Sequence, residues 1–262
     1  MKLHHVFDTP KKIVVVMPAF NAASTLKATM DHVPPDLVDE FILVDDASKD
    51  NTFEQARTLG ITVLRHPENR GYGGNQKSCY RLAIASKADI VVMLHPDNQY
   101  NPEIIPNLIL PILMDQADVV LASRFICDPL KGGPVAGGMP FLKFFANRCL
   151  TFVQNALMGT YFSEFHTGYR AFNSNALSEI QLDLLSNDFA FDNEILAVLA
   201  YQKKRFAQVA VETRYFKEAS TIHFLPGVRY AACCLLIGFH YFLDRIGIRQ
   251  WNWLHRVAKK PG

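Results

Sequence analysis

Short apolar runs alternate with longer amphipathic stretches through the first half of the chain. The apolar runs are bounded by turn-forming residues and predict buried strands at 13–17, 40–44, 61–64, 90–94 and 119–122. The stretches between them predict helices at 24–32, 50–59, 75–86 and 102–116. Ser24 is the expected N-cap of the first helix, and Asp50 or Asn51 that of the second. Pro106 and Pro111 are expected to bend or split the last. This alternation predicts an α/β fold with a mostly parallel, doubly wound sheet.

A glycine- and proline-rich loop at 132–140 separates this pattern from a second region. Residues 141–162 are amphipathic and predict either a core helix or a helix at a lipid surface. Residues 228–243 predict either a C-terminal core helix or a helix lying on a membrane face. They fall short of the roughly 20 apolar residues that a membrane span requires, and His240 interrupts them.

Composition is that of a globular chain and excludes few classes of function. The chain has 262 residues, of which 49% are hydrophobic and 20% charged, which is enough for one large domain. A net charge of +2 gives no reason to expect nucleic acid as a partner. Five scattered cysteines without a CxxC pair are typical of a reducing, cytoplasmic location. Residues 11–17 imitate a short signal peptide, but a first buried strand explains them as well.

Candidate chemistry follows the predicted strand at 90–94, in the loop His95-Pro96-Asp97-Asn98-Gln99. The carboxyl ends of strands are where open α/β sheets bind their ligands. Asp97 is therefore expected at the mouth of a cleft, where it could hold a divalent cation against a phosphate.

Three other loops are expected at the same edge of the sheet. The first two predicted strands end in Pro18-Ala19-Phe20-Asn21 and in Asp45-Asp46-Ala47-Ser48, and these loops could clasp a nucleotide base. The third ends in Asn69-Arg70-Gly71-Tyr72-Gly73-Gly74-Asn75, where glycines allow backbone N–H groups to approach a ribose or phosphate. A dinucleotide fingerprint is disfavoured, because Gln76 stands where its last glycine should be.

Together these motifs resemble the family 2 glycosyltransferases, and among them the polyprenyl-phosphate sugar synthases. Those enzymes carry Asp-x-Asp-x-Gln followed by Pro-Glu, and Asp97, Gln99 and Pro102-Glu103 match, with His95 in place of the first Asp. The resemblance runs from about residue 12 to 220. It implies a GT-A fold over 1–225, with a nucleotide half at about 12–125, an acceptor half at about 126–225 and a helical tail at 226–262.

The resemblance also implies roles for individual residues. Asp46 would accept a hydrogen bond from a base, with Pro18 and Phe20 lining the pocket. Arg124 would approach the diphosphate, and Asp97 with His95 would hold Mg²⁺ or Mn²⁺. The acceptor side would use Arg170, Arg214 and the acidic Asp192. The full nucleotide-sugar set is Pro18, Ala19, Phe20, Asn21, Asp46, Ser48, Gly71, Gly73, Asp97, Gln99 and Arg124.

The expected function is inverting transfer of a sugar from a UDP- or GDP-linked donor to a polyprenyl phosphate, in cell-envelope glycan synthesis. Two alternatives stay open. One is transfer to a sugar hydroxyl, with Asp192 as the base; the other is an inactive scaffold, for which His95 is the main argument. A nucleotidyltransferase is disfavoured, because the Pro18–Asn21 loop is not its glycine-rich loop. The chain is expected to contact the inner face of a membrane peripherally and to form homo-oligomers.

Overall fold

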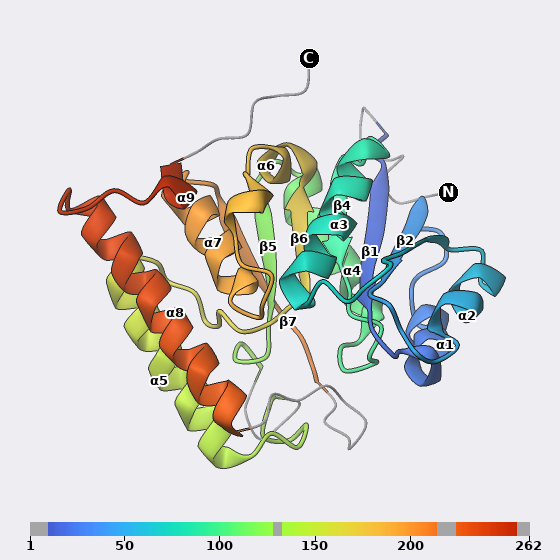
Figure 1. The fold of residues 1–262 in the computed structure, drawn as a ribbon, viewed down its shortest axis with the longest axis horizontal. Helices are drawn as coiled ribbons and strands as arrows, with labels where there is room; N and C mark the ends of the chain where they lie inside the picture. The colour runs from blue at the N-terminus through green and yellow to red at the C-terminus, as the bar shows by residue number, and fades with distance from the viewer. Residues whose placement is uncertain (1–9, 128–132, 214–223, 256–262) are drawn as a thin grey trace.

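A computed structural model describes residues 10–127, 133–213 and 224–255 (Figure 1). Its strands are β1 (Ile13–Ala19), β2 (Glu40–Asp45), β3 (Thr62–Arg65), β4 (Ile90–Met93), β5 (Val119–Ser123), β6 (Arg170–Asn173) and β7 (Phe206–Ala210). They form one sheet in the order β3-β2-β1-β4-β6-β5-β7. β1 pairs in parallel with β2 and β4, β2 with β3, and β5 with β7, which confirms the expected mostly parallel α/β sheet.

β6 is the exception, because it lies between β4 and β5 and runs antiparallel to both. Neither β6 nor β7 was predicted from the pattern, since both are short and polar residues begin or interrupt them. Strands from before and after residue 125, where the nucleotide half was expected to end, therefore belong to one sheet. β6, which comes late in the chain, is thus an inner strand of the sheet, whereas β7, the last strand, lies at its edge.

Alternating side chains give the sheet two apolar faces, each covered by helices. Val14 and Val16 point to one face, which packs on α3 (Tyr72–Ala85), α6 (Ser174–Ser178) and α7 (Phe191–Tyr201). Ile13, Val15 and Met17 point to the other, which packs on α1 (Ala23–Asp31), α2 (Thr52–Thr58) and α4 (Ile105–Leu113). Because both faces are buried, the parallel strands consist of nearly unbroken apolar residues.

The expected helices are present, with shifted ends. Ser24 is not the N-cap of α1; that position is Ala22, and the hydroxyl of Thr52 accepts from its backbone N–H at 2.8 Å. Asn51 is the N-cap of α2, but without a side-chain hydrogen bond. The segment after residue 102 divides into a 3₁₀ turn, Pro102–Ile104, and α4, which carries Pro111 inside.

Two long helices lie side by side along one flank of the molecule (Figure 1). They are α5 (Phe141–Met158) and α8 (Phe224–Arg245), and the short α9 (Asn252–His255) follows. Their inner sides reach the core through Met158, Ile237 and Tyr241. Within the described residues, no helix is long and apolar enough to cross a membrane.

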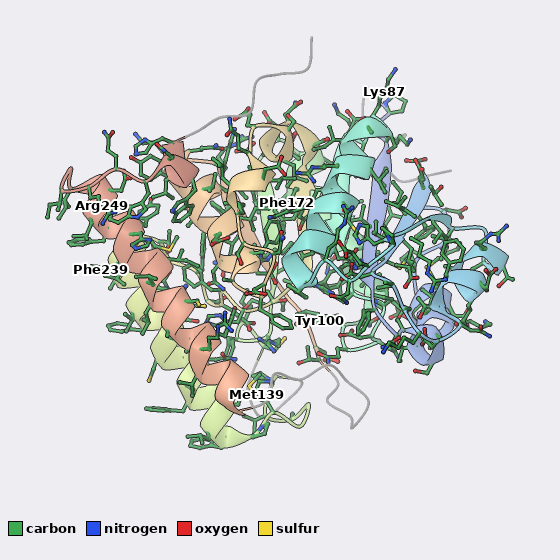
Figure 2. The ribbon with its side chains drawn as sticks, viewed as in Figure 1. Lys87, Tyr100, Met139, Phe172, Phe239 and Arg249 are labelled. Carbon is green, nitrogen blue, oxygen red and sulfur yellow. The ribbon has the colours of Figure 1, made fainter. Side chains whose placement is uncertain are left out.

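The outer side of this pair is unusually apolar. Large hydrophobic side chains are exposed on both helices, and Figure 2 labels one of them, Phe239, on α8. On α5 they are Phe141, Leu142, Phe145, Phe152 and Val153. On the described part of α8 they are Val228, Leu235, Leu236, Phe239 and Phe242. We call these ten residues the α5–α8 face. Each helix thus packs inward, as a core helix does, and also exposes apolar residues outward.

Candidate active site

A cavity of about 890 Å³ opens at the carboxyl ends of the parallel strands. Tyr100, labelled in Figure 2, lies in its wall at this edge of the sheet. The cavity extends from the loops after β1 and β2 to the first turns of α5 and α8. The predicted site residues in its wall are Pro18, Ala19, Phe20, Asn21, Asp46, Gly71, His95, Asp97, Gln99, Arg124 and Asp192.

The loop after β1 presents an aromatic ring at the cavity. Phe20 is 51% exposed there, and Asn21 adopts a left-handed backbone, φ 52°. Ser48 is not in the wall. Its hydroxyl accepts from the Asn21 backbone N–H at 2.8 Å, so that it holds the loop in place. An exposed ring on a fixed loop suits stacking on a nucleotide base.

Asp46 ties the loop after β2 to the loop between β3 and α3. Its Oδ1 accepts from the Arg70 backbone N–H at 2.9 Å and from His66 Nδ1 at 2.7 Å, and its Oδ2 accepts from the Gly71 backbone N–H at 3.1 Å. His66 is buried and also lies 2.9 Å from the Ser78 hydroxyl. An ionised carboxylate has about four acceptor positions, so one is left for a ligand.

The two predicted glycines have different tasks. Gly71 is in the cavity wall with φ 81°, a conformation that favours glycine. Gly73 lies outside the wall, and its N–H donates to the Asn187 carbonyl at 2.7 Å. A Cβ there would come within 2.6 Å of both Phe191 Cβ and the Ser186 carbonyl. The structure thus gives Gly73 the role of close packing against 186–191, in place of the expected ligand contact.

Asp97 is enclosed in the cavity wall, and burial raises the pKa of its carboxyl while nearby His95 opposes the shift. Its Oδ1 accepts from the Gln99 backbone N–H at 3.1 Å. No cluster of three His, Cys, Asp or Glu side chains suited to a metal occurs in the described residues. This donor set fits a cation held by one carboxylate and the phosphates of a substrate, as Mg²⁺ often is.

His95 stacks on Tyr72, with an interplanar angle of 7°. The Tyr72 hydroxyl donates to Asp192 Oδ2 at 2.7 Å and lies 3.2 Å from His95 Nε2. Because the phenol has only one hydrogen, His95 Nε2–H must donate to it. The lone pair of a neutral His95 is then on Nδ1, which is the nitrogen that could approach a cation.

Arg170 and Asp192 form one buried unit. Arg170 is 1% exposed and is not in the cavity wall. Its NH1 donates to the Asp192 carbonyl at 2.9 Å and lies 3.5 Å from Asp192 Oδ1, while NH2 donates to the Phe165 carbonyl at 3.1 Å. Gln76 also donates to Oδ1, at 3.2 Å. The expectation that Arg170 contacts an acceptor phosphate is therefore replaced by a role in fixing Asp192.

Arg124 reaches the cavity wall but is also bound to a carboxylate. Glu164 is 0% exposed, and its Oε1 accepts from Arg124 Nε at 2.8 Å and from NH2. Lys143, one turn into α5, is a further cation in the wall, and burial with the nearby Arg124 lowers the pKa of its ammonium. Sequence reasoning missed Lys143 as a site residue, although it stands in the first turn of the expected amphipathic helix.

The far end of the cavity is apolar and lies between the first turns of the two flank helices. Its apolar lining there is Pro140, Leu142, Ala146, Leu150, Val228 and Ala231, interspersed with Lys143, Asn147 and Tyr230. Leu142 and Val228 also belong to the α5–α8 face, so the cavity and that face are continuous. An apolar wall that opens onto an apolar surface suits a ligand with a hydrocarbon part.

Several wall residues escaped the sequence analysis. Tyr72, His166 and Tyr230 are all in the wall. Tyr72 lies within the glycine motif 69–75, which could have drawn attention to it. His66, which is outside the wall but binds Asp46, follows β3 just as Asp46 follows the paired β2, so the adjacent strand ends could have indicated this contact. His166 had a comparable signal, because it stands four residues before Arg170 in the segment predicted for the acceptor, whereas Tyr230 had none. Arg214, the second predicted acceptor-side cation, lies outside the described residues.

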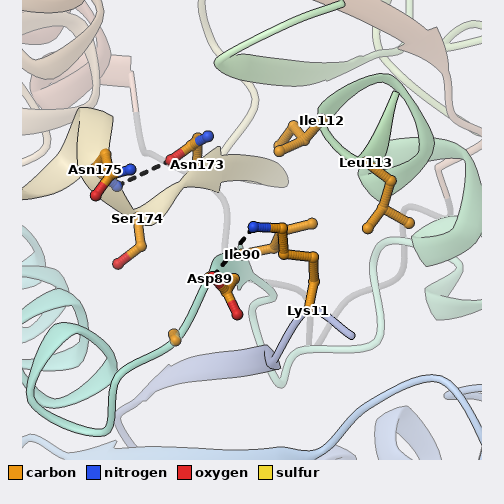
Figure 3. A pocket seen from close by; sticks show the side chains of 9 residues that line it. Lys11, Asp89, Ile90, Ile112, Leu113, Asn173, Ser174 and Asn175 are labelled. Carbon is orange, nitrogen blue, oxygen red and sulfur yellow. Dashed lines mark hydrogen bonds and ion pairs between the residues drawn. The ribbon is translucent and has the colours of Figure 1, made fainter. Parts of the chain in front are cut away.

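A second hollow of about 80 Å³ lies at the other end of β4 (Figure 3). Lys11 and Asp89 form an ion pair in its wall, with 3.6 Å between Lys11 Nζ and Asp89 Oδ1. It has room for only a few water molecules, because one water takes about 30 Å³ of liquid volume. The larger cavity is therefore the candidate active site.

Comparison with known proteins agrees with this geometry. The family model described as glycosyl transferase family 2 matches residues 14–180. The chain is 28% identical over 222 residues to UDP-N-acetylglucosamine–dolichyl-phosphate N-acetylglucosaminyltransferase of Methanococcus voltae, covering 78% of this chain and 86% of that protein. It is 25% identical over 210 residues to undecaprenyl-phosphate mannosyltransferase of Micrococcus luteus, covering 76% and 82%.

Solved structures show the same fold. Glucosyl-3-phosphoglycerate synthase of Mycobacterium tuberculosis in complex with UDP superimposes with a TM-score of 0.65 at 21% identity, covering 96% of this chain and 87% of that chain. The same enzyme with Mn²⁺, UDP and glucosyl-3-phosphoglycerate gives 0.62 at 19% identity, covering 92% and 81%. These enzymes have the GT-A fold, and so does this chain. With the family model matching well over half of its length, the chain belongs to glycosyl transferase family 2.

Proposed function

We propose that this glycosyltransferase moves a sugar from a UDP- or GDP-linked donor to a polyprenyl phosphate, with inversion at the anomeric carbon. The observation that carries the proposal is the shape of the 890 Å³ cavity. Its polar end, with the strand-end loops, is continuous with its apolar end between α5 and α8. A donor and a lipid-bearing acceptor can meet there.

At the donor end, the base would stack on Phe20 and hydrogen-bond to Asp46. Phe20 is exposed to the cavity, and Asp46 Oδ2 keeps an acceptor position beside the one used by Gly71 N–H. The loops are already held by Ser48, His66 and the Arg70 backbone, so little order is lost when the nucleotide binds. The relatives' names support a nucleotide-linked donor, since one includes UDP-N-acetylglucosamine.

Asp97 would hold Mg²⁺ or Mn²⁺ against the donor's diphosphate, together with His95 Nδ1 where the cation takes a nitrogen ligand. The enclosed Asp97 carboxylate and the tautomer of His95 set by Tyr72 support this assignment. The cation supplies neutralisation of the leaving diphosphate. Arg124 lies in the same wall and adds positive charge on the acceptor side of the diphosphate.

At the acceptor end, Lys143 and Arg124 would attract a phosphate, and the apolar wall would take the first part of the hydrocarbon chain. Leu142, Ala146 and Val228 line that wall. A phosphate monoester is already anionic near neutral pH, so it needs no strong base. This matches the state of Asp192, whose carboxylate already accepts from Tyr72 and Gln76.

Delivery of such an acceptor suits a protein that rests on a lipid surface. We assign that contact to the α5–α8 face, because it is exposed, apolar and continuous with the apolar end of the cavity. Arg229, whose side chain is 81% exposed and lies 3.8 Å from Asp188 Oδ2 in an exposed ion pair, and Lys143 stand beside it and would attract anionic lipids. The relatives named for dolichyl and undecaprenyl phosphates support association with a membrane, and we propose its inner face.

The test is a transfer assay with three acceptors of one chain length. Purified protein is given UDP- and GDP-sugars with Mn²⁺, Mg²⁺ or EDTA, and farnesyl phosphate, farnesol or a sugar hydroxyl acceptor. We expect product with farnesyl phosphate only, and only with a divalent cation. Product with the sugar hydroxyl but not with the phosphate would overturn the proposed acceptor and favour Asp192 as a base. Absence of nucleotide release under every condition would favour an inactive scaffold.

A further inference from the structure

His166 lies in the cavity wall with one ring nitrogen bonded and the other without a partner. Its Nδ1 is 3.0 Å from the hydroxyl of Tyr230 on α8. Its Nε2 has no hydrogen-bond partner in the part of the chain that the structure describes, and it is enclosed. An enclosed polar atom without a partner is unfavourable, so a ligand that satisfied it would be stabilised by the contact.

A chain of hydrogen bonds determines which nitrogen of His166 carries the proton. Gln154 on α5 donates to Asn193 Oδ1 at 2.8 Å, and Asn193 Nδ2 donates to the Tyr230 hydroxyl at 2.7 Å. The hydroxyl oxygen is thus an acceptor from Asn193, and its one hydrogen is left for His166 or for the nearby thiol of Cys234. Imidazole nitrogen is the stronger acceptor of the two. Tyr230 therefore donates to Nδ1, and His166 carries its hydrogen on Nε2.

Two arginines lie near His166, each paired with a buried carboxylate, and the ring itself is neutral. Burial, Arg124 and Arg170 lower the pKa of His166 to about 3. Arg124 NH2 also donates to the His166 carbonyl at 3.3 Å, which holds the segment in place. With its hydrogen on Nε2, the ring has no lone pair there, which excludes a metal ion as the missing partner of this nitrogen. An anionic oxygen is the partner that both the hydrogen on Nε2 and the nearby arginines favour.

We propose that His166 donates its Nε2–H to a phosphate oxygen of the acceptor, and that Tyr230 is a positioning residue that holds His166 in the required tautomer. The inference rests on the proposed function, since the acceptor is taken to carry a phosphate. It adds a residue of α8 to the site, so the flank helix takes part in acceptor recognition as well as in lipid contact.

The experiment follows the His166 nitrogens by NMR in protein labelled with ¹⁵N-histidine, titrated with farnesyl phosphate, farnesol and inorganic phosphate. In the wild type we expect a neutral ring with hydrogen on Nε2 at pH 7, and a shift of Nε2 with farnesyl phosphate but not with farnesol. A shift with inorganic phosphate alone would identify the headgroup as sufficient. His166→Leu, which removes the donor, is used to assign the signal.

The variants separate donation from packing. Tyr230→Phe keeps the ring and is expected to spread His166 over both tautomers and to weaken farnesyl phosphate binding several-fold. His166→Leu is expected to weaken it tenfold to a hundredfold, as for a lost hydrogen bond to a charged group, whereas His166→Gln, which keeps an N–H donor, retains part of the affinity. The controls are Tyr241→Phe and His240→Gln, both on α8 and outside the cavity wall. Nucleoside diphosphate affinity is expected to be unchanged in all of them.

Two failures can be told apart. If farnesyl phosphate does not bind the wild type, the proposed function is overturned and this inference with it. If it binds but leaves the His166 nitrogens unchanged, or binds His166→Leu as tightly as the wild type, only the inference is overturned. A wild-type ring with hydrogen on Nδ1 would overturn the role of Tyr230.

Discussion

The two ends of the cavity are built in different ways. At the donor end, Phe20, Asp46 and Asp97 come from loops directly after β1, β2 and β4, and each keeps an atom or a face for a ligand. At the acceptor end, the buried cations are already committed, Arg124 to Glu164 and Arg170 to Asp192. The proposed donor end would therefore bind directly through strand-end side chains, whereas the proposed acceptor end would depend on a network that is already formed before any ligand arrives.

The largest effect on stability is expected from a substitution at the proposed acceptor end. Asp192→Asn leaves the buried Arg170 without its carboxylate, and loss of one partner of a buried ion pair costs about 3–5 kcal/mol of stability. Chemical denaturation measures it. The control is Asp31→Asn, which removes the exposed Lys27–Asp31 pair and should cost less than about 1 kcal/mol. Equal losses in the two variants would show that the acceptor-end network is not a structural unit.

That coupling changes what the two residues can reveal about the acceptor. Arg170 and Asp192 look like independent candidates in the sequence, one for a phosphate and one for a proton. In the structure they are hydrogen-bonded to each other, so a substitution in either residue disturbs both. Loss of transfer in Arg170→Lys or Asp192→Asn therefore does not by itself identify the acceptor, and the choice of acceptor in the assay must do so.

At the donor end, Asp97→Asn should impair transfer by about 10²–10³-fold, the typical loss when one group that stabilises developing charge is removed. Steady-state rates with Mn²⁺ in excess measure it. Full activity of the variant in EDTA would show that no cation is used.

The same variant should gain stability when no metal is present. Burial raises the pKa of Asp97, so its contribution to stability is present in full below the pKa of the unfolded chain and is lost as pH rises through the raised value. Above that raised pKa the half-buried carboxylate is ionised and unfavourable, and Asn removes that cost. Thermal unfolding at pH 7 should therefore give a higher Tm for Asp97→Asn than for the wild type. A lower Tm would show that the Asp97 charge is stabilised by the protein itself.

Phe20→Ala should weaken nucleoside diphosphate binding by about 1–3 kcal/mol, the usual value of aromatic stacking on a base. Because Phe20 is 51% exposed, the free energy of unfolding should hardly change. Calorimetric titration measures the affinity. Phe152→Ala, an exposed phenylalanine on α5 away from the cavity wall, is the matched control. Equal affinities for Phe20→Ala and the wild type would show that the base does not stack on Phe20.

The smallest effect concerns the α5–α8 face. Phe152→Ser with Phe239→Ser should reduce flotation with anionic liposomes several-fold, because only two of the ten apolar side chains of the face are removed and the other eight can still contact lipid. Leu110→Ser with Met114→Ser, which changes exposed apolar residues around the end of α4, is the control. If neither pair changes flotation, or if the wild type stays at the bottom of the gradient, the face is not a lipid contact.

The same contrast explains how much the sequence could predict. The donor end was predictable because each residue follows its own strand: Asp97 comes three residues after the apolar run 90–94, and Phe20 three after 13–17. Such local patterns place residues at one edge without knowledge of the sheet order. The helices and most strands followed from the same periodicity.

The acceptor end was not predictable because its contacts join residues far apart in the chain. Arg124 meets Glu164, and Tyr230 meets His166 across 64 positions, pairings that no local pattern indicates. The sequence could name Arg170 as a cation of interest but not show that Asp192 already binds it. Gly73 was misassigned for the same reason, since its partner is the distant Asn187.

The central position of β6 also determines the order in which this chain can fold during synthesis. Until residues 170–173 have left the ribosome, β4 and β5 cannot acquire the neighbour that joins them, and each presents an unpaired edge. The N-terminal half of the chain is therefore a poor candidate for an independently folding fragment. The nascent protein must stay protected from aggregation until more than 170 residues have been made.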